Sequence, residues 1–187
     1  MSVREDANLT PSQQGMSDLW DRHTQSEFET CSVEATMDTM VEDPYVNHVP
    51  VMTGGVGRDE VRKFYSERFI PQQPPDAEIA FVTRTIGEDR LVDELIFKFT
   101  HTVGMDWMLP GVTPTGKRVE IPLVVVVQFR DGKIASEHIY WDQASVLVQI
   151  GLLDFETLPI AGVEVARKVL DPTLPSNELM KRANRSG

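Results

Sequence analysis

Cysteine, positive charge and long apolar runs are all scarce in this chain. With one cysteine, Cys31, among 187 residues, no disulfide can form within a single chain, which fits a reducing compartment. Lysine and arginine number 18 against 29 aspartates and glutamates, for a net charge of −11. Because nucleic acids and anionic membrane surfaces are bound through basic patches, the composition argues against both as partners.

The longest apolar run, Leu123–Val127, has only the length of a strand, well short of the roughly 20 residues of a membrane-spanning helix. Residues 1–15 are polar and contain no apolar segment of the kind found in signal peptides. We therefore expect a cytoplasmic protein without a membrane segment. A chain of 187 residues is long enough for one domain with its own core.

Two common catalytic and cofactor motifs are also missing. The glycine-rich stretch Thr53–Gly57 has neither the Gly-x-Gly-x-x-Gly spacing nor the terminal Gly-Lys-Ser/Thr of phosphate-binding loops. It is interpreted as a turn before a helix. No Gly-x-Ser-x-Gly elbow occurs, which argues against covalent hydrolase chemistry.

What the chain does contain is a helical pattern followed by strands. After a loose tail at residues 1–16, a helix is expected from near Ser17 to about Met40, with Leu19, Trp20, His23, Glu27 and Phe28 at helical spacing. A second helix follows Gly57 and stops at Pro71. Residues 17–155 are expected to form the domain, and residues 156–187 a C-terminal extension.

From Glu78 onward the apolar period changes to two, which is typical of strands. The expected strands are Glu78–Gly87, Leu91–Thr102, Val119–Phe129 and a fourth after the turn at Asp131–Gly132. Helices followed by an antiparallel sheet predict an α+β fold. We expect the sheet to curve around the N-terminal helices as a cone with an internal pocket.

Pairing across the Asp131–Gly132 turn assigns faces to the last strand. Without a bulge, Val125 lies opposite His138 and Ile121 lies opposite Asp142. Because directly opposed residues share a face, Asp142 is expected to project from the core face. A slip of one residue would place it outside.

Several short motifs occur in order along the second half: Thr100-His101-Thr102, Pro114-Thr115-Gly116-Lys117, Asp131-Gly132-Lys133-Ile134, Tyr140-Trp141-Asp142 and Gln149-Ile150-Gly151-Leu152. Through them the chain resembles the SnoaL-like polyketide cyclases of the nuclear transport factor two-like superfamily, over roughly residues 17–155. The resemblance implies a general acid/base role for Asp142, a pocket-lining His101, and no metal or organic cofactor. Residues 103–113 are longer than the corresponding link in that family.

Each candidate has a structural alternative. Asp142 directly precedes an expected helix and is also a favoured N-cap residue, and His101 could be an ordinary buried histidine. Substrate-binding candidates are expected on the walls of the pocket, where ordinary core packing is the alternative; they are Trp20, His48, Trp107, His138, Tyr140 and Trp141. A metal set built from His48, His101, His138 and Asp142 lacks any local metal motif, so no metal is expected.

A carboxylate on an apolar face has its pKa raised by desolvation, which suits proton transfer near neutral pH. Together with the resemblance, this predicts a cyclase, isomerase or lyase that acts on a small, mostly apolar carbonyl compound. The alternative is a non-catalytic, dimeric ligand-binding module, since fold does not fix chemistry. An apolar outer face of the sheet predicts a homodimer. The residues expected on this face are Val92, Ile96, Val124, Val126 and Ile139.

Overall fold

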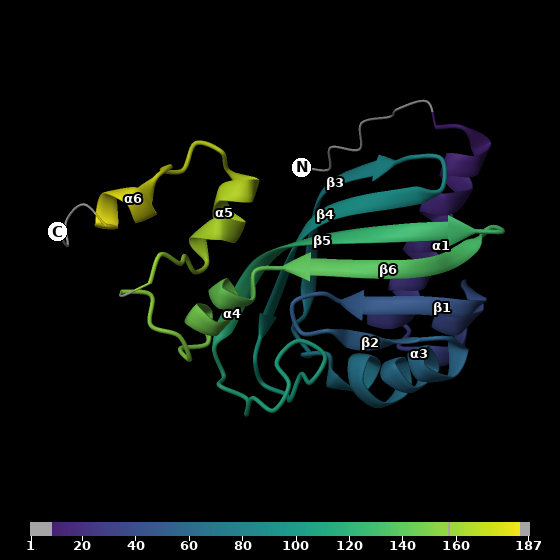
Figure 1. Ribbon diagram of the computed structural model, residues 1–187, viewed down its shortest axis with the longest axis horizontal. Coiled ribbons are helices and arrows are strands. Elements are labelled where there is room, and N and C mark those ends of the chain that lie inside the picture. Colours follow the sequence, from purple (N-terminus) through teal and green to yellow (C-terminus); the bar gives the residue numbers. More distant parts are fainter. Residues whose placement is uncertain (1–8, 157, 184–187) are drawn as a thin grey trace.

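A computed structural model describes residues 9–156 and 158–183 of the chain. Six strands form one sheet in the order β2-β1-β6-β5-β4-β3 (Figure 1). Their bounds are β1 Met40–His48, β2 Thr53–Val56, β3 Glu78–Ile86, β4 Arg90–Thr100, β5 Arg118–Arg130 and β6 Lys133–Trp141. All neighbours pair antiparallel except β1 with β6, which are parallel. The expected α+β fold is confirmed, with this one parallel pair as an addition.

The first helix, α1, spans Pro11–Phe28 and begins earlier than the sequence pattern indicated. The Thr10 hydroxyl accepts from the backbone N–H of Gln13, and the Gln13 side chain accepts from the Thr10 N–H, which forms a capping box. Residues 11–16, expected to be tail, are therefore helical. Residues 1–8 of that expected tail lie outside the described part of the chain.

The helix predicted to run to Met40 is divided in two. The backbone at Cys31 has a φ of +50°, which breaks the helix. A new helix, α2 Val33–Asp38, then begins, and the Ser32 side chain caps it by accepting from the N–H of Ala35. The break lets α2 lie against both α1 and α3 before the chain enters β1.

The second helical stretch packs against β2 and β1 at one edge of the sheet. It consists of α3 Arg58–Phe64, a π-helical turn at Tyr65–Phe69 and a 3₁₀ turn at Ile70–Gln72. In Figure 1, α1 lies behind the sheet and α3 lies below β2. The core is the space between these helices and the inner face of the sheet, where Tyr65 and Phe99 are fully buried.

A β-bulge in β6 determines which side chains of that strand face the core. Pairing starts as predicted, with Phe129 opposite Ile134, but Ala135 is an extra residue and Gln128 lies opposite Ser136. Every later residue of β6 is displaced by one position. Val125 therefore lies opposite Ile139, and the predicted pairing of Val125 with His138 is wrong.

The C-terminal part forms three short helices beside one end of the sheet, α4 Gln143–Gln149, α5 Glu164–Leu170 and α6 Glu178–Ala183 (Figure 1). The Gln149 side chain accepts from the backbone N–H of Glu120 and donates to its carbonyl, at 2.9 and 3.0 Å. Arg167 of α5 lies 3.9 Å from the Glu120 carboxylate. These contacts attach α4 and α5 to β5, and residues 184–187 lie outside the described part.

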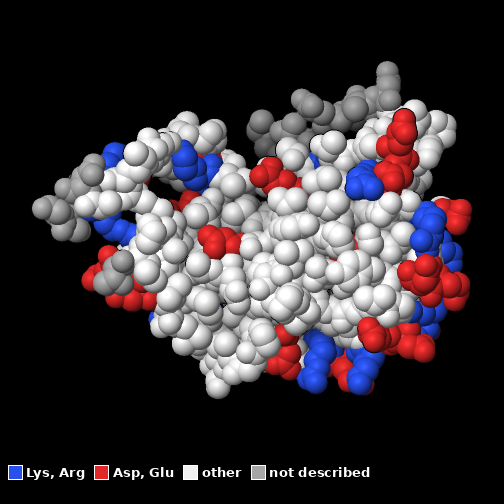
Figure 2. Space-filling model, in the orientation of Figure 1, with Lys and Arg blue, Asp and Glu red and all other residues white. Residues whose placement is uncertain are grey.

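The centre of the sheet face seen in Figure 2 carries few charged side chains, which gather along the edges of the molecule. Val92, Val124 and Val126 are half-buried, whereas Ile96 is fully buried. Ile139, expected on this outer face, instead faces the core because of the bulge. Within the described residues, no helix has the length and apolar character needed to cross a membrane.

Candidate active site

A cavity of about 70 Å³ lies between α1 and the inner face of the sheet. Its walls are mainly aromatic and aliphatic; they comprise Trp20, Thr24, Phe28, His48, Tyr65, Phe69, Ile79, Leu95, Phe97, Trp107, Leu123, Val125 and Ile139, together with the two acids Glu27 and Glu137. Thr24, Phe28 and Ile79 are the more exposed members, so the cavity faces solvent between the end of α1 and β3. Such a site favours a small, largely apolar ligand.

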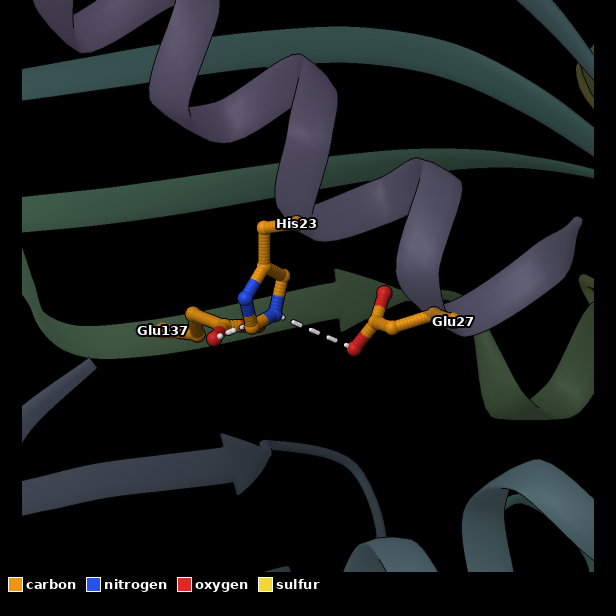
Figure 3. Close-up of side chains that lie close together, drawn as sticks. All are labelled: His23, Glu27 and Glu137. Carbon is orange, nitrogen blue, oxygen red and sulfur yellow. Dashed lines mark ion pairs between the residues drawn. The ribbon is translucent and has the colours of Figure 1, made fainter. Parts of the chain in front are cut away.

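Two acids and a histidine meet at the cavity (Figure 3). His23 and Glu27 are four residues apart on α1 and therefore share one helix face. Glu137 comes from β6, where it lies opposite Val127 and points inward because it follows the bulge. The His23 Nε2 atom is 3.2 Å from Glu27 Oε1 and 3.1 Å from Glu137 Oε1. All three side chains are almost completely buried.

Tyr65 and Thr39 complete the hydrogen bonding of this cluster. The Tyr65 hydroxyl donates to Glu137 Oε1 at 3.3 Å and lies 3.3 Å from His23 Nε2. On the other side of the imidazole, Nδ1 is 2.6 Å from the Thr39 hydroxyl oxygen. Both nitrogens of His23 are therefore held by partners, which fixes the ring orientation.

The charges in the cluster follow from its burial. Burial acts to lower the pKa of His23, but the carboxylates of Glu137 and Glu27 outweigh it and raise that pKa to about 10. Burial raises the pKa of Glu27, against the opposing effect of His23. Burial and the two carboxylates also raise the pKa of Tyr65 well above its usual range. At neutral pH the cluster thus contains an imidazolium and a neutral phenol.

Trp20 forms the wall beside His23 and is itself held in place. Its ring stacks on the imidazole with a centroid distance of 5.2 Å and an interplanar angle of 16°. The indole Nε1 donates to Asp93 Oδ2 at 2.8 Å, and Arg84 donates to both Asp93 oxygens at 2.7 and 2.8 Å. Asp93, the polar exception on the inner face of β4, thus orients this wall.

Residues 20–137, well over half of the chain, match the model of the family described as the SnoaL-like domain. This chain belongs to the SnoaL-like domain family. No protein of curated function gives a significant match.

Solved structures agree with this assignment at the level of fold. One is a protein from Jannaschia sp. CCS1 named provisionally as a SnoaL-like polyketide cyclase; it has 17% identity and a TM-score of 0.64 over 79% of this chain and 99% of its own. TsrD from Streptomyces laurentii has 14% identity and a TM-score of 0.59 over 78% and 99%. A protein of ketosteroid isomerase-like fold from Catenulispora acidiphila, solved with trimethylamine, has 14% identity and a TM-score of 0.57 over 78% and 96%.

In this SnoaL-like domain, Asp142 is not placed where the unbulged register predicted. Its side chain is exposed and caps α4 by accepting from the N–H of Ser145 at 3.2 Å. The expected core-facing orientation is wrong because the bulge at Ala135 shifts the later residues by one position, and such a shift exchanges the inward and outward faces of the strand. The structural alternative of an N-cap is the one observed.

His101 is buried as expected, but it is absent from the walls of the cavity. The backbone N–H of Thr115 donates to its Nδ1 at 3.3 Å, and the Gly116 N–H donates to its carbonyl at 2.9 Å. Burial lowers the pKa of His101. Its contacts close the base of the loop between β4 and β5, and the structure does not bring it together with Asp142 at the cavity.

The expected ligand-binding residues divide between the two faces of the sheet. Trp20, His48 and Trp107 line the cavity. Trp141 is buried, with its ring centroid 5.6 Å from that of His48, but it does not line the cavity. His138 and Tyr140 follow the bulge on the outer face, where Tyr140 is 43% exposed, so their expected inward orientation is wrong.

The loop at residues 103–113 contributes Trp107 to one wall of the cavity. Its residues Met105, Trp107, Met108 and Leu109 are buried. The Thr53 hydroxyl donates to the Trp107 carbonyl at 2.6 Å, and Arg68 donates to Asp106 at 3.0 Å. The ring of His48, at the end of β1, lies 5.3 Å from that of Trp107. Burial lowers the pKa of His48 to about 3, so that its ring is neutral at physiological pH.

The sequence analysis did not single out His23, Glu27, Tyr65 or Glu137 as candidates. The signal was present for two of them, since His23 and Glu27 occur at the same helical spacing as Leu19 and Trp20 on an apolar face. The ligand atoms of His23, Glu27 and Glu137 lie within 4.8 Å of one another, and such a set could hold a cation. Across residues 9–156 and 158–183, this is the one group of that kind.

Proposed function

We propose that this SnoaL-like domain is a general acid/base enzyme that acts on a small, mostly apolar carbonyl compound without a metal or organic cofactor. The observation that supports it is the position of Glu27 and Glu137 on the wall of an apolar cavity, each hydrogen-bonded to His23. Cyclase, isomerase and lyase reactions of carbonyl compounds all require such proton transfers.

The two acids are suited to complementary roles. Glu137 Oε1 faces the Tyr65 hydroxyl and the His23 imidazolium, and we assign it the role of base. Glu27 has its pKa raised by burial, and we assign it the role of acid. Carboxylates whose environments differ in this way commonly divide the two roles.

The proposed step is proton removal from a carbon next to the carbonyl group. The C–H bond breaks, its proton forms an O–H bond with Glu137, and the electron pair moves through the new C=C bond onto the carbonyl oxygen. Glu27 gives that oxygen its proton, so the product is a neutral enol and the proton count balances. The aromatic walls exclude water, which strengthens the hydrogen bonds to the developing charge.

A second candidate is a ligand-binding module without catalysis. The largely apolar walls of the cavity would bind a small compound whether or not a proton moves. The two candidates differ in one observable, because only the enzyme exchanges protons of the bound compound with solvent.

Deuterium exchange provides the test. A panel of small cyclic and open-chain ketones is incubated with the protein in deuterated water, and loss of the proton signals next to the carbonyl is followed by NMR. Exchange above the buffer background that persists after EDTA treatment supports the proposal. Ketone binding without exchange indicates the ligand-binding module, and exchange that is lost with EDTA and restored by Zn²⁺ contradicts a cofactor-free mechanism.

We further infer that the chain forms a homodimer through the outer face of the sheet. Val92, Val124 and Val126 leave an apolar surface there, with Tyr140 beside it. An apolar surface of this kind is commonly covered by a second copy in symmetric dimers.

A further inference from the structure

Thr39 occupies a buried position between α2 and the imidazole of His23. Its hydroxyl oxygen is 2.6 Å from the Thr36 carbonyl oxygen and 2.6 Å from His23 Nδ1. A carbonyl oxygen can only accept, so the single hydroxyl proton of Thr39 must point toward Thr36. The Thr39 oxygen is then left as an acceptor, and His23 Nδ1 must carry a proton that it donates to Thr39.

This arrangement determines which nitrogen of His23 can exchange a proton. With Nδ1 permanently a donor, His23 can gain or lose a proton only at Nε2. The groups that face Nε2 are Glu27 from α1, Glu137 from β6 and the Tyr65 hydroxyl. Trp20 stacks on the ring face and adds no further titratable group.

We propose that Thr39 is a positioning residue that restricts the proton exchange of His23 to Nε2, between the two cavity acids. This inference rests on the proposed acid/base function and adds a residue that does not touch the ligand. Without the Thr39 acceptor, neutral His23 could place its proton on Nε2 instead. The imidazole would then present an N–H to the two carboxylates in its neutral form and would no longer be able to take a proton there.

Two matched variants separate this role from a purely structural one. Thr39→Val keeps nearly the same volume but removes the hydroxyl, whereas Thr39→Ser keeps the hydroxyl and removes a methyl group. Thr39 also ends α2, where its backbone N–H bonds to the Thr36 and Met37 carbonyls. Both variants preserve this backbone contact, so any difference between them reports the hydroxyl.

The first measurement is made on the ligand-free protein and does not depend on activity. In protein labelled with ¹⁵N-histidine, with His23 assigned by a His23→Gln variant, a slowly exchanging Nδ1–H signal is expected in the wild type and in Thr39→Ser. In Thr39→Val this signal is expected to exchange rapidly and the pKa of His23 to fall, because the imidazolium has lost an acceptor. A folded Thr39→Val protein whose His23 signals match the wild type overturns the proposal.

The second measurement follows the ketone deuterium exchange across pH. Thr39→Val is expected to move the alkaline limb of the rate to lower pH, which lowers the rate about tenfold on that limb, with Thr39→Ser close to wild type. Changed NMR signals with an unchanged exchange profile overturn the positioning role. Absence of exchange in the wild type overturns the proposed enzyme function, and with it the positioning role, while the NMR measurement alone decides the hydrogen-bond assignment.

Discussion

The Glu137 carboxylate and the His23 imidazole lie 3.1 Å apart although they come from opposite layers, β6 of the sheet and α1 behind it. Their contact joins the helix to the sheet at the cavity and gives both groups a charged partner in an apolar surrounding. A buried charged pair is costly to break, since the remaining group keeps its charge without compensation.

Replacing Glu27 by Gln should reduce the ketone exchange rate by roughly 10²–10⁴-fold if Glu27 is the acid. Glu29→Gln is the matched control, because Glu29 is exposed near the end of the same helix. Exchange rates by NMR and folding by circular dichroism are the measurements. A Glu27→Gln protein with wild-type exchange removes Glu27 from the mechanism.

Stability should fall as pH rises from about 6.5 toward 10. The pKa of His23 is raised in the folded protein, from an ordinary value of 6.5 to about 10. Its contribution is therefore complete below the unfolded value and disappears as pH passes the folded one. Urea unfolding at pH 6.5, 8 and 10 measures this loss. In Glu27→Gln the loss should move to lower pH, because one of the two carboxylates that raise the His23 pKa is gone.

His48 should make the protein sensitive to acid. Burial lowers the pKa of His48 from 6.5 to about 3. Between these two pH values, His48 is therefore protonated in the unfolded chain but neutral in the folded protein. Its contribution is present above pH 6.5 and disappears as pH falls toward 3. The ring of His48 lies among those of Phe64, Phe69 and Trp107. In His48→Phe, the urea concentration at the midpoint of unfolding should fall less steeply as the pH is lowered, which gives a flatter acid limb. An identical acid limb in the variant would show that His48 does not contribute to it.

Asp142→Ala should destabilise the protein by about 1 kcal/mol through loss of the α4 cap. Asp142→Asn should be nearly neutral, because asparagine caps equally well. Neither change should alter ketone exchange, since the Asp142 side chain is exposed and lies outside the cavity walls. A large loss of exchange in the folded Asp142→Asn protein would restore the catalytic role suggested by the family resemblance.

The proposed dimer depends on the outer face of the sheet. Val126→Lys should shift the protein to monomer in sedimentation equilibrium at micromolar concentration, because a charge would be buried in an apolar interface. Lys63→Glu on α3 is a control for charge change away from this face. A monomeric wild type would contradict the dimer directly.

The period of the apolar residues was sufficient to predict the layers of this fold. Alternation in Leu91–Thr102 and Val119–Phe129 identified β4 and β5 to within two residues at each end. The start of α1 was missed because its first turn, beginning Pro11-Ser12-Gln13, is polar and exposed. The Thr10–Gln13 capping box was the local sign of that start.

The site was harder to predict than the fold because it depends on contacts between distant elements. Glu137 reaches His23 only because β6 contains a bulge, and the residues directly beside Ala135, Ile134 and Ser136, are neither glycine nor proline and give no sign of one. Trp20, His48 and Trp107 were recognised because large rings are often buried near a pocket. The predicted inward orientation of Asp142 is wrong because of the same extra residue, Ala135, that brings Glu137 inward.

The extra alanine in β6 also affects how this protein is aligned with its relatives. A relative whose equivalent strand lacks the extra residue would align correctly with this chain only if a gap opened beside Ala135. Without that gap, the inward-facing Glu137 would be compared with an outward-facing position of the relative. For this chain, deletion of the Ala135 codon would restore the unbulged register of β6. The side chains from Ser136 to Trp141 that now face inward would then face outward, and the reverse.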